Sequence, residues 1–275
     1  MTQVTRPMAP PAPAGRPGGE AWLPVLRVGA VVLTVAVIGF GTLAVASTFF
    51  QRVHTETKAF AGTVRAVHVT EDVGDVKVRV ATPGEQVRAT ARITESFDHG
   101  VWSAELEGDT LTVDGSCRQA GITLFDCNVD LTLVVPDGIP VEIESNTGDL
   151  SVAGAFSAVR AQTNTGDVRV LQAAGPVHIS TDTGDVRSLD TNATTVTAKT
   201  DTGDVRLVFD VAPRTVSTET STGDVTVLVP DDGASYSVAT DTSTGDETVD
   251  VSNVPRAANV ITAKTDTGDV TVAYR

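Results

Sequence analysis

The sequence repeats one short phrase, Thr-Gly-Asp, seven times between residues 147 and 269. Counted from glycine to glycine, the steps are 18, 18, 19, 20, 22 and 23 residues. A fixed phrase at a period in this range is typical of a stacked repeat, in which one unit cannot bury its apolar face alone. The phrase therefore constrains the fold more strongly than any other feature of the chain.

The segments on both sides of the phrase alternate β-branched and polar residues with a period of two. Val159–Thr163 and Val177–Thr181 precede the phrase, while Val205–Leu207 and Val270–Val272 follow it. This alternation indicates half-buried strands. We therefore predict an all-β, single-stack β-solenoid or β-roll of about seven or more coils, in which each coil is a strand, a Gly-Asp corner, a second strand and a polar return.

The Gly-Asp pair of each phrase is predicted to be a structural turn. Glycine adopts positive φ without a steric penalty, and aspartate accepts a hydrogen bond from its own turn. The predicted turn residues are Gly148, Asp149, Gly166, Asp167, Gly184, Asp185, Gly203, Asp204, Gly223, Asp224, Gly245, Asp246, Gly268 and Asp269.

The threonines before each corner share the parity of the apolar residues. Side chains two apart on a strand lie on one face, so we expect these threonines to point inward and their hydroxyls to bond from coil to coil. The two clearest sets are Val159, Ala161, Thr163 and Thr165, and Val177, Ile179, Thr181 and Thr183.

Composition limits both the core and the partners. The chain of 275 residues has 8 Phe, 2 Trp and 2 Tyr, so valine, alanine and threonine must fill the interior. The formal net charge of −15 argues against nucleic acid as a partner.

The N-terminal region is predicted to anchor the protein. Residues 1–26 are a Pro/Gly-rich segment expected to be a disordered cytoplasmic tail. Residues 27–50 contain 23 consecutive uncharged residues from Val28 to Phe50, which is long enough for a transmembrane helix. The alternative is an export signal cleaved after Ala46, which would release the protein. Both interpretations place the following residues outside the cytoplasm; of these, 51–58 are expected to be a polar stalk.

Residues 59–275 are predicted to be one extracytoplasmic repeat domain. Within it, 59–140 are expected to form irregular capping coils, with weaker echoes of the corner at Gly74-Asp75 and Gly108-Asp109. Residues 141–275 carry the regular repeats. Glu247 departs from the pattern because other coils have valine or leucine after the corner.

Cys117 and Cys127 are the only cysteines in the chain. In an exported domain an even pair indicates a disulfide that closes the intervening loop. A metal pair or a redox couple is the alternative, but the spacing does not match Cys-x-x-Cys and no histidine is close in the sequence.

The pattern at Val177–Ser188 and Ile261–Val272, together with Cys127–Val129 and Val135–Gly138, resembles the bacterial "putative adhesin" family, a domain of unknown function. The resemblance covers roughly residues 60–275. It implies a β-solenoid on the cell surface, often behind one membrane helix, and by analogy a role in the envelope or in envelope stress. It implies no activity.

Catalytic motifs are absent from the sequence, and its four histidines are scattered. The aligned aspartates are the best candidate for a site, because carboxylates stacked about 4.8 Å apart repel one another unless they are neutralised. Arg169, Arg187 and Arg206 are available to the central coils. The C-terminal aspartates lack such arginines and are the candidate calcium ligands: Asp224, Asp246 and Asp269.

We therefore expect a non-enzymatic envelope or surface interaction module that is held to the membrane by one helix and requires no cofactor. Its partner is expected to be an envelope polymer or protein. Two other hypotheses remain: a calcium-dependent surface binder and, more distantly, a hydrolase of envelope polymers.

Overall fold

The computed structural model describes residues 52–96, 99–118 and 127–275. These residues form strands and no helix, which confirms the all-β class. The predicted tail and the predicted membrane helix lie outside the described residues. Within the described ranges, no helix has the length and apolar character that a membrane span requires.

The described residues form 21 strands in two sheets. Sheet A has the spatial order β1 (Arg52–Phe60), β4 (Val87–Glu95), β7 (Cys127–Val135), β3 (Val76–Val80), β9 (Leu150–Ala153), β11 (Val168–Leu171), β13 (Val186–Thr191), β15 (Val205–Phe209), β17 (Val225–Val229), β21 (Val270–Tyr274) and β19 (Glu247–Asp250). Sheet B has the order β18 (Tyr236–Thr244), β20 (Asn259–Thr267), β16 (Thr215–Glu219), β14 (Thr195–Thr202), β12 (Val177–Thr183), β10 (Ala158–Thr165), β8 (Pro140–Thr147), β2 (Ala66–Val73), β6 (Thr110–Arg118) and β5 (His99–Glu107).

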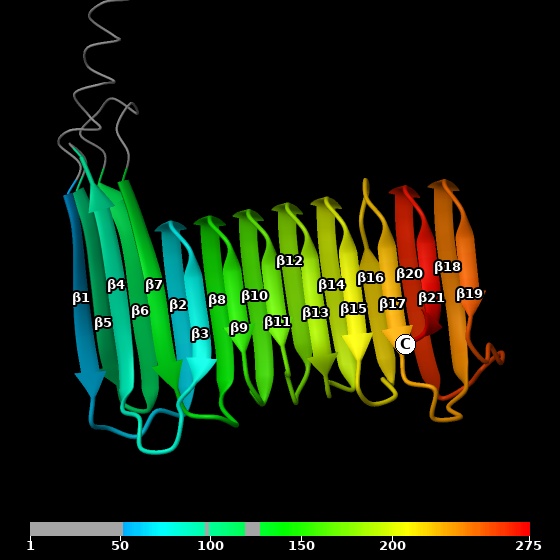
Figure 1. The fold of residues 1–275 in the computed structure, drawn as a ribbon, viewed down its shortest axis with the longest axis horizontal. Helices are drawn as coiled ribbons and strands as arrows, with labels where there is room; N and C mark the ends of the chain where they lie inside the picture. The colour runs from blue at the N-terminus through cyan, green and yellow to red at the C-terminus, as the bar shows by residue number, and fades with distance from the viewer. Residues whose placement is uncertain (1–51, 97–98, 119–126) are drawn as a thin grey trace, which may run out of the picture. The chain divides into compact units, whose positions relative to one another are not determined.

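Each Thr-Gly-Asp phrase joins one strand of sheet B to the next strand of sheet A. Successive coils pair in parallel and in register, so Thr163 lies beside Thr181 and Val168 beside Val186. Figure 1 shows the coils side by side along the long axis of the unit. The apolar residues between the sheets form one continuous core.

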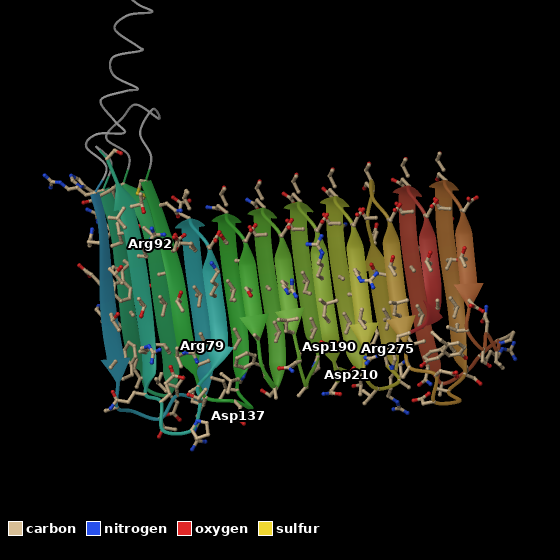
Figure 2. All side chains as sticks on the ribbon, in the orientation of Figure 1. Arg79, Arg92, Asp137, Asp190, Asp210 and Arg275 are labelled. Carbon is tan, nitrogen blue, oxygen red and sulfur yellow. A yellow bond between two sulfur atoms is a disulfide. The ribbon has the colours of Figure 1, made fainter. Side chains whose placement is uncertain are left out.

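At the C-terminal end the coils do not follow the order of the sequence. The last coil in the chain, β20–β21, pairs with β16–β17 on one side and with β18–β19 on the other. The chain therefore builds the outermost coil first and then returns to fill the gap (Figure 1). The C-terminal Arg275 pairs with Asp210 of an earlier coil, as Figure 2 shows.

The N-terminal end is built by an insertion. The coil β2–β3 has the regular corner at Gly74-Asp75. The strands β4–β7 follow it in the sequence and pair partly in antiparallel fashion to form the end of the stack. Cys117 and Cys127 form a disulfide between β6 and β7. Gly108-Asp109 is the turn of the antiparallel β5–β6 hairpin rather than a corner between the sheets.

Residues 52–58, expected to be a stalk, lie in β1. This strand pairs with β4 over its whole length, from Arg52 with Glu95 to Phe60 with Val87. The backbone hydrogen bonds offered by the free edge of β4 account for the strand, because the side chains of β1 are almost all exposed.

Burial follows the predicted parity up to the threonine two residues before each phrase. Thr163 and Thr181 are buried, whereas Thr165 and Thr183 are exposed. The expectation that all four point inward is therefore wrong for the second threonine, because the chain is already turning out of the sheet at this residue.

The corner glycine is tightly constrained by the neighbouring coil. Gly203 has a φ of 143°, and a Cβ at this position would lie 2.1 Å from the carbonyl oxygen of Gly184. We expect Gly203→Ala to lower the free energy of unfolding by about 3 kcal/mol or more, from backbone strain and coil separation together. Chemical denaturation measures this, with Gly233→Ala as the control: Gly233 also has positive φ but nothing lies near its missing Cβ. Equal losses in both variants would contradict the close-packing explanation.

Candidate functional site

The corner aspartates form a hydrogen-bonded ladder along one edge of the stack. The Oδ1 atom of every member except the last accepts the backbone N–H of the aspartate in the next coil, at 2.8–3.1 Å. We expected each aspartate to accept a hydrogen bond from its own turn. The donor comes instead from the neighbouring coil. In spatial order the ladder contains Asp75, Asp149, Asp167, Asp185, Asp204, Asp224, Asp269 and Asp246.

The buried threonine hydroxyls complete the corner. Thr181 Oγ1 donates to the carbonyl oxygen of Gly166 at 3.1 Å, and Thr200 Oγ1 donates to that of Gly184 at 3.0 Å. The hydroxyls therefore bond from coil to coil through the glycine carbonyl and not to one another. A buried hydroxyl without a partner is costly, and this geometry satisfies both the hydroxyl and the carbonyl.

The arginines near the ladder differ in their contacts. Arg187 reaches Asp167 Oδ2 at 3.6 Å and Asp185 Oδ2 at 2.7 Å, so it bridges two coils. Within the described ranges no ion pair forms at Arg169 or Arg206. The expected neutralisation by arginine therefore operates at one position. Asp75 pairs with Lys77 at 3.4 Å, and the amide bonds of the ladder stabilise the remaining carboxylates except Asp246, which ends the row.

The reordered coils place Asp269 between Asp224 and Asp246. The three predicted calcium ligands are thus consecutive in the ladder, with Asp246 at its end. Oδ1 of Asp224 and of Asp269 already accepts an amide. In the part of the chain that the structure describes, no group of three or more His, Cys, Asp or Glu side chains is arranged to hold a metal ion.

The ladder predicts different effects for two substitutions of Asp204, whose Oδ1 accepts the Asp224 amide at 2.9 Å. Asp204→Ala removes the acceptor and is expected to lower the free energy of unfolding by about 1 kcal/mol. Asp204→Asn keeps an oxygen acceptor and removes a charge from the row, so we expect at most half of that loss. Urea denaturation compares the two variants, and a larger loss for the asparagine variant would show that the charge matters more than the acceptor.

Glu71 is a buried carboxyl at the N-terminal end of the threonine row. It lies beside Ser145, at the position that threonine occupies in later coils, and it is only 2% exposed. Its Oε1 accepts the amides of Asp72 and Val73, while its buried Oε2 has no partner. Gly115 on β6 makes room for it, because a Cβ there would lie 1.9 Å from Oε2. Burial raises the pKa of the Glu71 carboxyl to about 8.

This raised pKa makes stability depend on pH. From about pH 4.5 to about pH 8 the unfolded chain releases the proton while the folded chain retains it. The contribution of Glu71 is therefore complete below pH 4.5 and is lost as pH rises through this window, by an amount on the order of 5 kcal/mol. We expect the unfolding free energy of the native chain to fall relative to Glu71→Gln between pH 5 and pH 9. Parallel pH curves for the two proteins would contradict the assignment.

A groove crosses the outer face of sheet B, where β2, β8, β10, β12 and β14 begin. Its volume is about 500 Å³. One row of its lining is mostly small and apolar, and a second row is mostly polar. The first row is Ala66, Pro140, Ala158, Pro176 and Thr195, and the second is His68, Glu142, Arg160, His178 and Thr197.

The polar row is close to neutral in charge. Glu142 lies between His68 Nδ1 at 3.6 Å and Arg160 Nε at 3.4 Å. Partial burial and then the charge of Arg160 lower the pKa of His178. His178 is therefore neutral at physiological pH and has one nitrogen that donates and one that accepts a hydrogen bond.

Sequence reasoning did not find this groove. It treated the histidines as scattered, whereas register pairing places His68 two strands away from Arg160 and three from His178. The signal that was available is positional, because Pro140, Ala158 and Pro176 occupy the same place at the start of successive repeats.

One known protein family matches part of this chain. Residues 139–273 match the Toastrack DUF4097 family. This match covers just under half of the chain and nearly all of the regular repeats. The match begins one residue before β8 and does not cover β1–β7. The expected resemblance to a domain-of-unknown-function family of β-repeat proteins is confirmed.

Three solved structures are similar at low identity. A "putative adhesin" from Bacteroides fragilis is 11% identical, with 80% of this chain and 97% of that chain covered and a TM-score of 0.48. A "putative cell adhesion protein" from Clostridium sporogenes is 12% identical, with 82% and 100% covered and a TM-score of 0.34. A "putative lipid binding protein" from Parabacteroides distasonis is 10% identical, with 80% and 96% covered and a TM-score of 0.41. No curated protein matches the sequence.

Proposed function

We propose that the protein is a non-enzymatic binding module of the cell envelope, displayed outside the cytoplasm by its N-terminal segment. We propose further that it holds an extended polymer in the groove on sheet B. The groove is the observation that carries this function. Its volume of about 500 Å³ lies in the range of ligand sites.

The direction of the groove favours an elongated ligand. It runs across the strands, so equivalent side chains recur about every 4.8 Å along it. A polymer lying along the stack would meet an apolar surface from one row and hydrogen-bonding groups from the other. Repeat proteins commonly use long surfaces of this kind for binding.

The charge of the groove narrows the ligand class. Glu142 is already paired with His68 and Arg160, and His178 is neutral. A neutral or weakly charged chain with amide or hydroxyl groups fits this lining better than a polyanion does.

Hydrolysis is less well supported by the same lining. Glycoside hydrolases commonly use two carboxyl groups that flank the bond to be cleaved. Glu142 is the only carboxyl group among the residues that line the groove, and it forms an ion pair with Arg160 and lies 3.6 Å from His68 Nδ1. This favours binding without catalysis.

The proposal predicts that filling the groove abolishes binding. We expect Ala158→Trp to reduce co-sedimentation of the protein with isolated insoluble envelope at least tenfold, because the indole would occupy the space between the two rows. Ser151→Trp is the matched control, since it adds the same side chain to the outer face of sheet A. Equal binding by both variants, or equal loss, would overturn the assignment of the groove.

Calcium-dependent binding is the second candidate. The reordering of the coils favours it, because Asp224, Asp269 and Asp246 become neighbours with at least one oxygen each outside the ladder. Thermal unfolding of metal-stripped protein, with and without millimolar calcium, distinguishes a calcium site from a row of aspartates held by backbone hydrogen bonds alone. Calcium binding predicts a rise in Tm that Asp224→Asn and Asp269→Asn abolish, whereas an unchanged Tm would assign the row to backbone bonding alone.

A further inference from the structure

The C-terminal end of the stack has two unpaired edges. β18 is the last strand of sheet B and β19 is the last strand of sheet A, so each has one neighbour. At the start of β18 the backbone of Tyr236 bonds to Ser252 and Val254, and the amide of Val238 bonds to the Asn253 side chain. The outer sides of the rest of β18 and of β19 have no partner strand within the described residues. Such edges accept further strands unless the protein prevents it.

This end repeats the face that internal coils use for stacking. β18 pairs with β20 from Tyr236 to Thr244, and β19 pairs with β21 from Glu247 to Asp250. The outer side of β18–β19 has the same two strands and the same corner as the faces already covered by a neighbouring coil. It is therefore continuous with an interface that the molecule forms many times within itself.

A charged side chain interrupts the apolar pattern on this face. The first inward position after the corner is buried and aliphatic in the internal coils, as at Val225 and Val270. In the outermost coil it is Glu247, which lies beside Val270 and is exposed. The next inward position, Val249, is 37% exposed.

Glu247 reaches across the open end of the core. Its Oε2 accepts a hydrogen bond from Thr240 Oγ1, so the contact joins sheet A to sheet B. A carboxylate at this place can remain hydrated only while no further coil covers it. Covering it would bury an unpaired charge, which is strongly unfavourable.

We propose that the outer face of β18–β19 is a docking surface for the same face of a second copy of this chain, and that Glu247 keeps it closed. A two-fold axis perpendicular to the stack would pair the free part of β18, residues 240–244, with the same part of its copy, and β19 with β19, both in antiparallel fashion. This pairing extends both sheets at once. The opposite end shows that these sheets accept antiparallel neighbours, because β1, β4 and β7 pair in this way. The two copies of Glu247 would then approach each other inside a closed core. Because burying both carboxylates is unfavourable, the native chain stays monomeric.

The test is the mass of the full-length protein in mild detergent, measured by sedimentation equilibrium over a hundredfold range of concentration. The native chain is expected to be monomeric. Glu247→Val, which restores the aliphatic pattern, is expected to strengthen self-association at least tenfold. Glu247→Gln removes the charge, keeps an acceptor for Thr240 and is expected to give an intermediate increase.

The control is Glu219→Val, which makes the same change at an exposed, outward position of β16 in the interior of the stack. It is expected to leave the protein monomeric. A second substitution, Val249→Lys added to Glu247→Val, is expected to restore the monomer. Folded Glu247→Val and Glu247→Gln proteins that stay monomeric would overturn the proposal. So would a native chain that is already dimeric, dimers of Glu219→Val, or dimers that survive Val249→Lys.

Discussion

Each coil is joined to the next through backbone groups at the Gly-Asp corner, and the rest of the structure depends on this junction. The absence of a Cβ lets each corner glycine approach the glycine carbonyl of the neighbouring coil. The aspartate then accepts an amide of the next coil, and the buried threonine donates to that same glycine carbonyl. The repeated phrase therefore satisfies polar backbone groups that the turn would otherwise leave unpaired, and the valine core is held in register by them.

A repeat that stacks well in both directions needs different residues at its ends. At the N-terminal end, β4–β7 and the Cys117–Cys127 disulfide cover the coil that carries Glu71. At the C-terminal end, Glu247 replaces an aliphatic side chain. Both departures from the repeat are carboxyl groups at inward positions, but burial keeps one protonated over a wide pH range while exposure leaves the other hydrated. A glutamate thus replaces the usual inward residue at both ends of the stack, buried at the N-terminal end and exposed at the C-terminal end.

The corner edge and the outer face of sheet B have different chemistry. Along the edge, carboxylates are occupied by amides of the neighbouring coils. On the face, small apolar residues and paired ionisable groups form a groove whose side chains come from segments up to about 130 residues apart, from Ala66 to Thr197. A binding function therefore agrees better with the face, because its groups are not all required to hold the stack together.

The sequence by itself determined the strands, the corners and the inward parity, since these depend on local periodicity and on residues with special backbone preferences. The predicted strand segments Val159–Thr163 and Val177–Thr181 lie in β10 and β12, and Thr163 and Thr181 are buried. Only the tertiary structure decided the order of the last two coils, the pairing of β1 and the groove around Arg160. Nearly identical coils offer nearly identical pairing energies, so local pattern cannot rank their order. The choice depends on which coil tolerates an open end, and a charged inward side chain at Glu247 is compatible only with the outermost place.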